Sequence, residues 1–246
     1  MKMRLAKFIA DSGFASRREA EKLITDGVVF VDNKKITTPV FFVDGTEQII
    51  INGKIISKNK DGLQIYLFHK PINTITSRSD PNGRKTIYDI LPKRYKNLKY
   101  VGRLDYKTTG LLLLTNDGEF ARKMTLPDSD IKRVYIATLH PKKITEIKSP
   151  SRSKALREFL SPLNSEDKVF DILRSGAIIN GVKYEPMDIQ VLSRYPIKIQ
   201  ITLTEGKKNE IRITMNWLGF MVKKLHRISY GKYHLGDLSV GKIKKI

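Results

Sequence analysis

One stretch of the chain combines an isolated carboxylate with features that would hold it rigidly. Asp105 follows Arg103 and stands shortly before residues 111–114, a leucine run too apolar for an exposed strand. A lone aspartate in a loop is usually a cap or a turn residue, but a loop anchored on a buried strand can fix a carboxylate in place. A nucleophile or a general base requires such a group. The sequence therefore makes Asp105 the candidate catalytic residue, whereas residues 116–118 have the composition of an ordinary turn.

The overall charge indicates a polyanionic partner. The 246 residues include 46 Lys and Arg but only 25 Asp and Glu, which gives a formal net charge of +21. This excess is larger than solubility requires and favours a nucleic acid. Single lysines also fit the codon bias of an AT-rich genome, but the whole excess does not. A basic membrane-surface protein would carry an amphipathic helix or an apolar span, and the sequence predicts neither.

Several common kinds of site are excluded by what the sequence lacks. Without cysteine, the chain can form neither a disulfide nor a thiolate zinc site, and it fits a reducing compartment. No histidine pair has metal-binding spacing, and no P-loop, G-x-S-x-G or G-x-G-x-x-G pattern is found. An RNA methyltransferase would need a glycine-rich loop after its first strand, which is also missing. Charges interrupt the N-terminus before it reaches signal-peptide length, so we expect a cytoplasmic protein.

The elements that must position Asp105 form two groups. Residues 1–58 predict a small domain of two short helices and a compact strand pair, with a capping box formed by Ser16 and Glu19. Residues 59–64 are expected to form a linker. Residues 65–246 alternate strands with loops and short helices, which is typical of a mixed domain. The expected fold class is therefore α+β.

The second domain contains the clearest periodic patterns. Strands are predicted most strongly at residues 66–69, 111–115, 134–139 and 197–203. Helices are predicted at residues 119–124, 155–160, 170–174 and 209–218. In the last of these, Ile211, Met215 and Leu218 share one face.

Cations gather around the capped helix of the first domain, at Lys7, Arg17, Arg18 and Lys22. With the amides at the start of that helix they could face a phosphate backbone, although any single one is more often part of a solvated helix face. The segment from residue 4 to residue 32 resembles the S4 RNA-binding domain. That resemblance implies RNA binding alone, because S4 domains occur on several enzymes and on non-enzymatic proteins.

The stretch around Asp105, residues 102–118, resembles the signature of the pseudouridine synthases that modify ribosomal RNA. Further segments resemble the family's motifs in the same order: residues 68–71, 133–135, 205–207, 210–212 and 225–227. With the S4-like segment, the similarity covers essentially the whole chain, and an ordered series is more specific than any one motif. It implies a mainly antiparallel sheet in the second domain.

The same resemblance implies a reaction, the isomerisation of uridine to its C-glycoside with neither cofactor nor metal. Asp105 would be the carboxylate that attacks the nucleotide, either at the anomeric carbon of the sugar or at the base. Arg212 would favour its ionised form and orient it. Tyr135 would stack against the base and take the proton from the carbon that forms the new bond. Without the motif order, Tyr135 would be interpreted as a core aromatic.

Other residues are expected to bind the substrate. The target must leave its helical stack, and Arg103 is the candidate wedge that fills the gap, while Ile211 would line the pocket behind the uracil. Arg133 stands where a lysine is frequent in the family, which keeps the charge but not the geometry. The expected partner is ribosomal RNA or a pre-ribosomal particle, bound by a monomer.

One further segment favours large-subunit ribosomal RNA. Residues 80–92 resemble the corresponding segment of the large-subunit synthase B type, and Arg84 and Lys85 within it would bind backbone phosphates. Judged from their turn-forming composition alone, the same residues would form a surface turn. A small-subunit target stays open, as does a non-catalytic RNA-binding assembly factor. The presence of Asp105, Tyr135 and Arg212 together argues against the latter.

Overall fold

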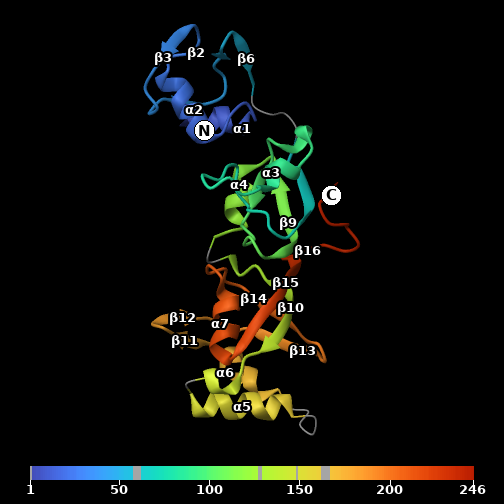
Figure 1. Cartoon of the computed structure of the whole chain (residues 1–246). Helices are drawn as coiled ribbons and strands as arrows, with labels where there is room; N and C mark the ends of the chain where they lie inside the picture. Colours follow the sequence, from blue (N-terminus) through green and yellow to red (C-terminus); the bar gives the residue numbers. More distant parts are fainter. Residues whose placement is uncertain (1, 58–61, 127–128, 148, 162–166) are drawn as a thin grey trace.

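The computed structural model describes residues 2–57, 62–126, 129–147, 149–161 and 167–246. Figure 1 shows a small N-terminal module beyond one end of a long twisted sheet, with α5 and α6 at the opposite end. The architecture is mixed α and β, as the sequence predicts. The expected linker, residues 59–64, lies largely outside the described residues, so the domain boundary stays a prediction.

The N-terminal module packs two helices against short strands. Its helices are α1 (Leu5–Asp11) and α2 (Arg17–Thr25). Its strands are β1 (Met3–Arg4), β2 (Val29–Val31), β3 (Lys34–Ile36), β4 (Phe42–Val43), β5 (Ile49–Ile51) and β6 (Lys54–Ile56). They form a four-stranded sheet in the order β3-β2-β5-β6 and a separate β1-β4 pair. The strand pair predicted from residues 28–36 is β2 with β3, and residues 49–54, which predict another strand and a tight turn, form β5 and the turn into β6. The short β1 and β4 were not predicted, because strands of two residues give little alternation to detect.

The predicted capping box at the start of α2 is confirmed. The Ser16 hydroxyl accepts a hydrogen bond from the Glu19 amide, and the Glu19 carboxylate accepts one from the Ser16 amide at 2.7 Å. Two amides that the helix cannot satisfy are thereby paired. Ala20 and Ile24 on the inner face of α2 are fully buried. The sequence therefore fixes both the start and the buried face of this helix.

The larger part of the chain is built on a nine-stranded sheet in the order β13-β14-β10-β15-β9-β7-β17, with β16 on β15 and β8 on β9. The strands are β7 (Ile65–Lys70), β8 (Lys99–Val101), β9 (Thr109–Thr115), β10 (Arg133–Pro141), β13 (Asp188–Arg194), β14 (Ile197–Leu203), β15 (Phe220–Tyr230), β16 (Tyr233–His234) and β17 (Ile243–Lys245). Only β9 and β15 pair in parallel. The expected mainly antiparallel sheet is confirmed.

Helices and a hairpin surround this sheet. The helices are α3 (Ile87–Ile90), α4 (Gly118–Lys123), α5 (Pro150–Leu160), α6 (Asp171–Arg174) and α7 (Glu210–Leu218), and the hairpin is β11 (Ala177–Ile179) with β12 (Val182–Tyr184). The strongest strand and helix predictions are all confirmed within a few residues. Asp117 does more than turn the chain, because its carboxylate caps α4 by accepting from the amides of Glu119 and Phe120. No helix in the described ranges is long and apolar enough to cross a bilayer.

Strand β9 lies between two hydrophobic cores. Leu112 and Leu114 face the main core, whereas Leu111 and Leu113 face a second cluster with Val101. All four leucines have no exposed surface. A strand buried on both faces reads as a continuous apolar run. The loop that carries Asp105 therefore ends on one of the most deeply buried strands of the protein, as the sequence predicts.

The parallel pairing of β9 with β15 depends on a glycine. Gly110 lies opposite Arg227, has φ +107°, and a Cβ atom there would lie 2.2 Å from the Arg227 carbonyl oxygen. No side chain fits this distance. The two strands approach so closely because residue 110 lacks a Cβ atom.

Gly110→Ala is expected to destabilise the protein by about 3 kcal/mol or more, because it adds a backbone clash to the strain of a positive φ. Gly181→Ala is the matched control, since Gly181 has φ +77° and open space around its Cβ position. The control should lose only about 1 kcal/mol from backbone strain. Urea unfolding of both variants measures these losses. If both variants lost the same free energy of unfolding, the close approach of β9 and β15 would not be what requires a glycine at position 110.

Candidate active site

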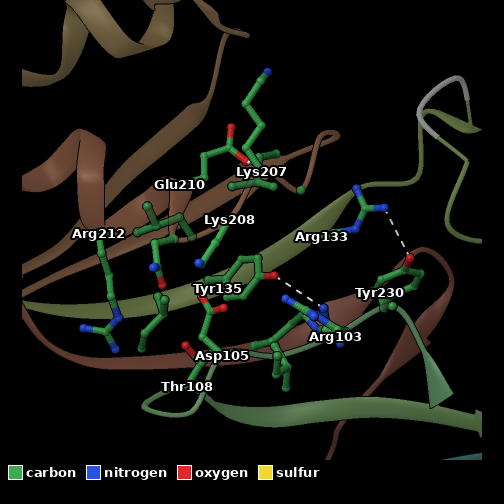
Figure 2. A pocket seen from close by; sticks show the side chains of 18 of the residues that line it. Arg103, Asp105, Thr108, Arg133, Tyr135, Lys207, Lys208, Glu210, Arg212 and Tyr230 are labelled. Carbon is green, nitrogen blue, oxygen red and sulfur yellow. Dashed lines mark hydrogen bonds between the residues drawn. The ribbon is translucent and has the colours of Figure 1, made fainter. Parts of the chain in front are cut away.

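A cavity of about 310 Å³ opens where the Asp105 loop, β10, β15 and the start of α7 meet. Figure 2 shows Asp105 and Tyr135 side by side in it, with Arg212 on one side and Arg133 and Tyr230 on the other. The structure thus brings together, from three separate segments, the residues predicted to catalyse the reaction. It also places Arg103 and Ile211 in the lining.

The Asp105 loop is fixed by a buried lysine. Lys70, at the end of β7, has no exposed surface. Its ammonium group donates to the main-chain oxygens of Pro71, Asp105 and Thr108, at 3.0, 3.2 and 2.8 Å. Burial lowers the pKa of Lys70 to about 8, against the opposing effect of the Asp105 charge. The sequence analysis assigned Lys70 no role, because only the fold brings it beneath a loop 35 residues away.

A second contact fixes the other side of the same loop. The Thr76 hydroxyl donates to the Leu104 carbonyl at 2.9 Å and accepts from the Leu104 amide at 3.2 Å, so it binds the residue before Asp105 at both main-chain groups. The Asn73 amide also donates to the Tyr106 carbonyl. The main chain of residues 104–108 is therefore held without any use of the Asp105 carboxylate.

Arg212 lies near Asp105 but does not pair with it. Its guanidinium donates to the carbonyls of Val222 and Lys107, each at 2.9 Å. Burial lowers the pKa of Arg212, and the Asp105 charge opposes this shift. Across the described ranges, Asp105 makes no ion pair. Arg212 therefore lies near Asp105 as expected, but it does not contact the Asp105 carboxylate directly.

Tyr135 is held by an arginine that the sequence analysis did not single out. Tyr135 follows a register irregularity in β10 and lies opposite Arg227 of β15. Arg227 is 1% exposed, and its Nε donates to the Leu111 carbonyl at 2.8 Å while Nη1 donates to the Tyr135 hydroxyl at 3.4 Å. The dashed line from the Tyr135 hydroxyl in Figure 2 marks this second bond. This contact fixes the position of the Tyr135 hydroxyl at the cavity.

Arg133 is buried and anchors the cavity wall. It donates to the carbonyls of Thr204 and Glu205 and, at 3.2 Å, to the Tyr230 hydroxyl. Its guanidinium also lies 4.9 Å from the centre of the Tyr230 ring. These contacts tie β10 to the loop that precedes α7. Arg133 also lines the cavity, so its predicted part in binding the substrate stays a prediction.

Glu210, the first residue of α7, is an unusual carboxyl group in the lining. It is 4% exposed, and its Oε2 accepts from the Lys207 amide at 3.0 Å. Burial, together with hydrogen bonding and repulsion from Glu205, raises the pKa of Glu210 to about 8. In the sequence, Glu210 stands out only as part of the motif at residues 210–212, because a raised pKa depends on burial and the spacing of residues does not reveal burial.

The remaining predicted RNA-binding residues lie outside this cavity. Arg17 and Arg18 are exposed at the start of α2, but Lys7 pairs with Glu119 of α4. Arg84 is paired with Asp80, which it contacts at 2.8 and 2.9 Å, and this hydrogen bonding lowers the pKa of Asp80 to about 2. In the part of the chain that the structure describes, no three metal-ligating side chains cluster.

Comparison with known proteins agrees with this geometry. The profile of a family described as RNA pseudouridylate synthase matches residues 64–217, and that of the S4 domain matches residues 3–49. The chain is 36% identical to an uncharacterised RNA pseudouridine synthase of Rickettsia conorii over 245 residues, covering 99% of this chain and 96% of the relative. It is 33% identical to the ribosomal large subunit pseudouridine synthase B of Bacillus subtilis over 247 residues, covering 99% and 91%. A solved pseudouridylate synthase shares the fold, with a TM-score of 0.64 at 23% identity over 99% and 96% of the two chains.

Glu210 is expected to make the stability of the protein fall as the pH rises. Its folded-state pKa of about 8 lies above its ordinary value of 4.5, so between these values the folded protein keeps a proton that the unfolded chain has released. The free energy of unfolding should therefore drop by about 1–3 kcal/mol over this window, since one pKa unit corresponds to about 1.4 kcal/mol and Glu205 shifts the opposite way.

Urea unfolding at a series of pH values measures this drop. Glu210→Gln, which stays neutral, should flatten the profile, whereas Glu146→Gln at an exposed position should retain it. A Glu210→Gln variant with the slope of the parent protein would contradict the assignment.

Proposed function

Because the chain belongs to the RNA pseudouridylate synthase family, we propose that it converts uridine to pseudouridine in ribosomal RNA, with Asp105 as the nucleophile. One observation carries this proposal. The main chain around Asp105 is fixed by Lys70 and Thr76, while its carboxylate forms no ion pair with any residue that the structure describes and lies in a cavity walled by an aromatic and an apolar residue. Such a carboxylate is positioned and still available to react.

In the proposal Asp105 reacts as a carboxylate, and both Lys70 and Arg212 lie close enough for their charges to interact with it. The carboxylate attacks either the anomeric carbon of the ribose or the base. The bond from that carbon to the base nitrogen breaks, the uracil turns within the pocket, and its C5 bonds to the sugar while Asp105 is released.

The new carbon bond leaves one proton to remove from C5, and the nitrogen that was bonded to the sugar takes up one proton, so the product is an isomer of uridine. Tyr135 is the base for this step in the proposal, because its hydroxyl lies in the cavity and receives a hydrogen bond from the Arg227 guanidinium. Ile211, 5% exposed, supplies an apolar surface for the uracil. Arg103 is exposed at the cavity, which suits a side chain that replaces the flipped uridine in the RNA stack.

Large-subunit ribosomal RNA is the proposed target. Relatives in Bacillus subtilis and Xanthomonas campestris are named ribosomal large subunit pseudouridine synthase B. The segment from Asp80 to Pro92 resembles the same type, and its turn is held by the pairing of Arg84 with Asp80. This pairing leaves the adjacent Lys85 as the more available phosphate contact.

Asp105→Asn should lower turnover by about 10³-fold or more, because an amide cannot act as the nucleophile. Folding and RNA affinity should change little, since the loop is held through its main chain. Carbodiimide primer extension on ribosomal RNA measures the product, and filter binding measures affinity. Near-normal turnover by Asp105→Asn would remove Asp105 from the central role, and lost affinity with intact folding would give it a binding role instead.

Deleting the gene should abolish pseudouridine at a site in large-subunit ribosomal RNA and leave small-subunit RNA unchanged. Pseudouridine mapping of both RNAs from the deletion strain checks this, and expression of the Asp105→Asn variant in that strain should not restore the site. Loss confined to small-subunit RNA would overturn the proposed target while leaving the proposed chemistry intact.

A further inference from the structure

A second hollow lies between the N-terminal module and the larger part of the chain. It has a volume of about 870 Å³ and is separate from the cavity that contains Asp105. One wall comes from α1 and the start of α2, and the other from the segment before β8 and from α4. In Figure 1, α4 lies directly beside the N-terminal module, where these walls face each other. We refer to this hollow as the junction cleft.

The junction cleft is strongly cationic. Its lining contains seven cationic residues and three acidic ones. The cations are Lys7, Arg17, Arg78, Lys96, Lys99, Arg122 and Lys123. Two of the acidic residues are already paired with lining cations, as Asp11 contacts Lys99 and Glu119 contacts Lys7.

Five cations are then left without a carboxylate partner within the described residues. Arg17, Lys96, Arg122 and Lys123 are exposed, and the third acidic residue, Glu19, is engaged in the helix cap with Ser16. Arg78 donates to the carbonyls of Lys96, Asn97 and Leu98, which fixes its guanidinium without neutralising its charge. A groove with this excess attracts a polyanion.

The lining also offers a surface for bases. Phe14, in the turn between α1 and α2, is 40% exposed and lines the cleft, as does Leu126 at 43%. Exposed aromatic rings beside cations bind single-stranded nucleic acid, because bases stack on the ring while phosphates contact the charges. An acidic protein segment would use the cations but gain little from Phe14.

The cleft and the Asp105 cavity share two segments of chain. Lys96 and Lys99 line the cleft, and after β8 ends at Val101 the chain continues through Gly102 and Arg103 into the cavity. Arg103 follows Lys99 by four positions, which a chain can span over at most about 14 Å. At the end of α4, Arg122 and Lys123 line the cleft while Thr125 lines the cavity. An RNA strand that leaves the Asp105 cavity along either segment therefore reaches the junction cleft without crossing the body of the protein.

We propose that the junction cleft binds the phosphate backbone of the substrate RNA beside the target uridine, gripping it from both domains at once. The proposal rests on the proposed function only in that the bound strand is the substrate. It assigns binding roles to Arg17 on one wall and to Arg122 and Lys123 on the other. Of these, only Arg17 was expected from the sequence.

The test uses the full-length protein with one variant per wall, Arg17→Ala and Arg122→Ala/Lys123→Ala. Both change exposed side chains, so the fold should be retained, and thermal melting checks it. The double variant should weaken RNA binding about tenfold and reduce the salt slope of log affinity by about 1–2, as expected when two phosphate contacts are lost. KM should rise with little change in kcat, because the cleft holds RNA away from the reacting atoms.

The control is Lys142→Ala/Lys143→Ala, which removes the same charge from a turn outside the cleft and should leave the affinity and the salt slope near those of the parent. A second comparison uses RNA length. With a short stem-loop that fills only the Asp105 cavity, the cleft variants should bind as the parent does, so the effect of the mutations depends on the flanking strand.

Each outcome decides one question. Equal losses of RNA affinity for the cleft and control variants would overturn the cleft as a specific binding surface. So would losses of affinity by the cleft variants that persist with the short RNA. Unchanged RNA binding by both cleft variants would also overturn it and would leave an acidic protein segment as the occupant to test. Because affinity and salt slope are measured without turnover, an absence of pseudouridine formation would count against the proposed function and not against the cleft.

Discussion

The active site depends on a single buried ammonium group. Removing an amine from water is costly unless hydrogen bonds replace its hydration, and among the described residues Lys70 regains them from three main-chain oxygens in and beside the Asp105 loop. The loop must therefore keep one shape for the lysine to stay satisfied. In return the lysine places a positive charge beneath Asp105. The sheet supports both, because β7, which ends at Lys70, pairs along its whole length with β9.

The cations around the cavity share one property that matters for the reaction. Lys70, Arg212 and Arg227 each direct their described hydrogen bonds to main-chain oxygens or, for Arg227, also to a tyrosine hydroxyl. Their charges act on the cavity, yet none of them forms an ion pair with Asp105 in the portion of the chain that the structure covers. For the proposed attack by Asp105 this matters, because a tight ion pair would have to break before the carboxylate could react.

Local sequence patterns predicted most of the helices and strands. The geometry of the site depends on contacts between segments that are distant in the sequence, and local patterns did not predict these contacts. The helix cap at Ser16, the buried run in β9 and the inner face of α7 are properties of short segments, and the sequence predicted all three. The roles of Lys70 and Arg227 depend on partners 35 and 116 residues away, which no spacing rule specifies. The family resemblance brought Asp105, Tyr135 and Arg212 together correctly. It gave no sign that Arg133 anchors β10 to the loop before α7, because it matches residue types and not their hydrogen bonds.

The contacts across the junction explain why RNA would matter to the arrangement of the two domains. Lys7 with Glu119 and Lys99 with Asp11 are partly exposed pairs, and such pairs contribute only about 0–1 kcal/mol each. The walls on either side carry five further cations. In the proposed complex, a polyanion between the walls would offset the repulsion among these cations and add contacts to both sides. The same RNA strand would then be held by the S4 domain and by the segment that leads into the Asp105 cavity, so contacts from both domains would set its position relative to that cavity.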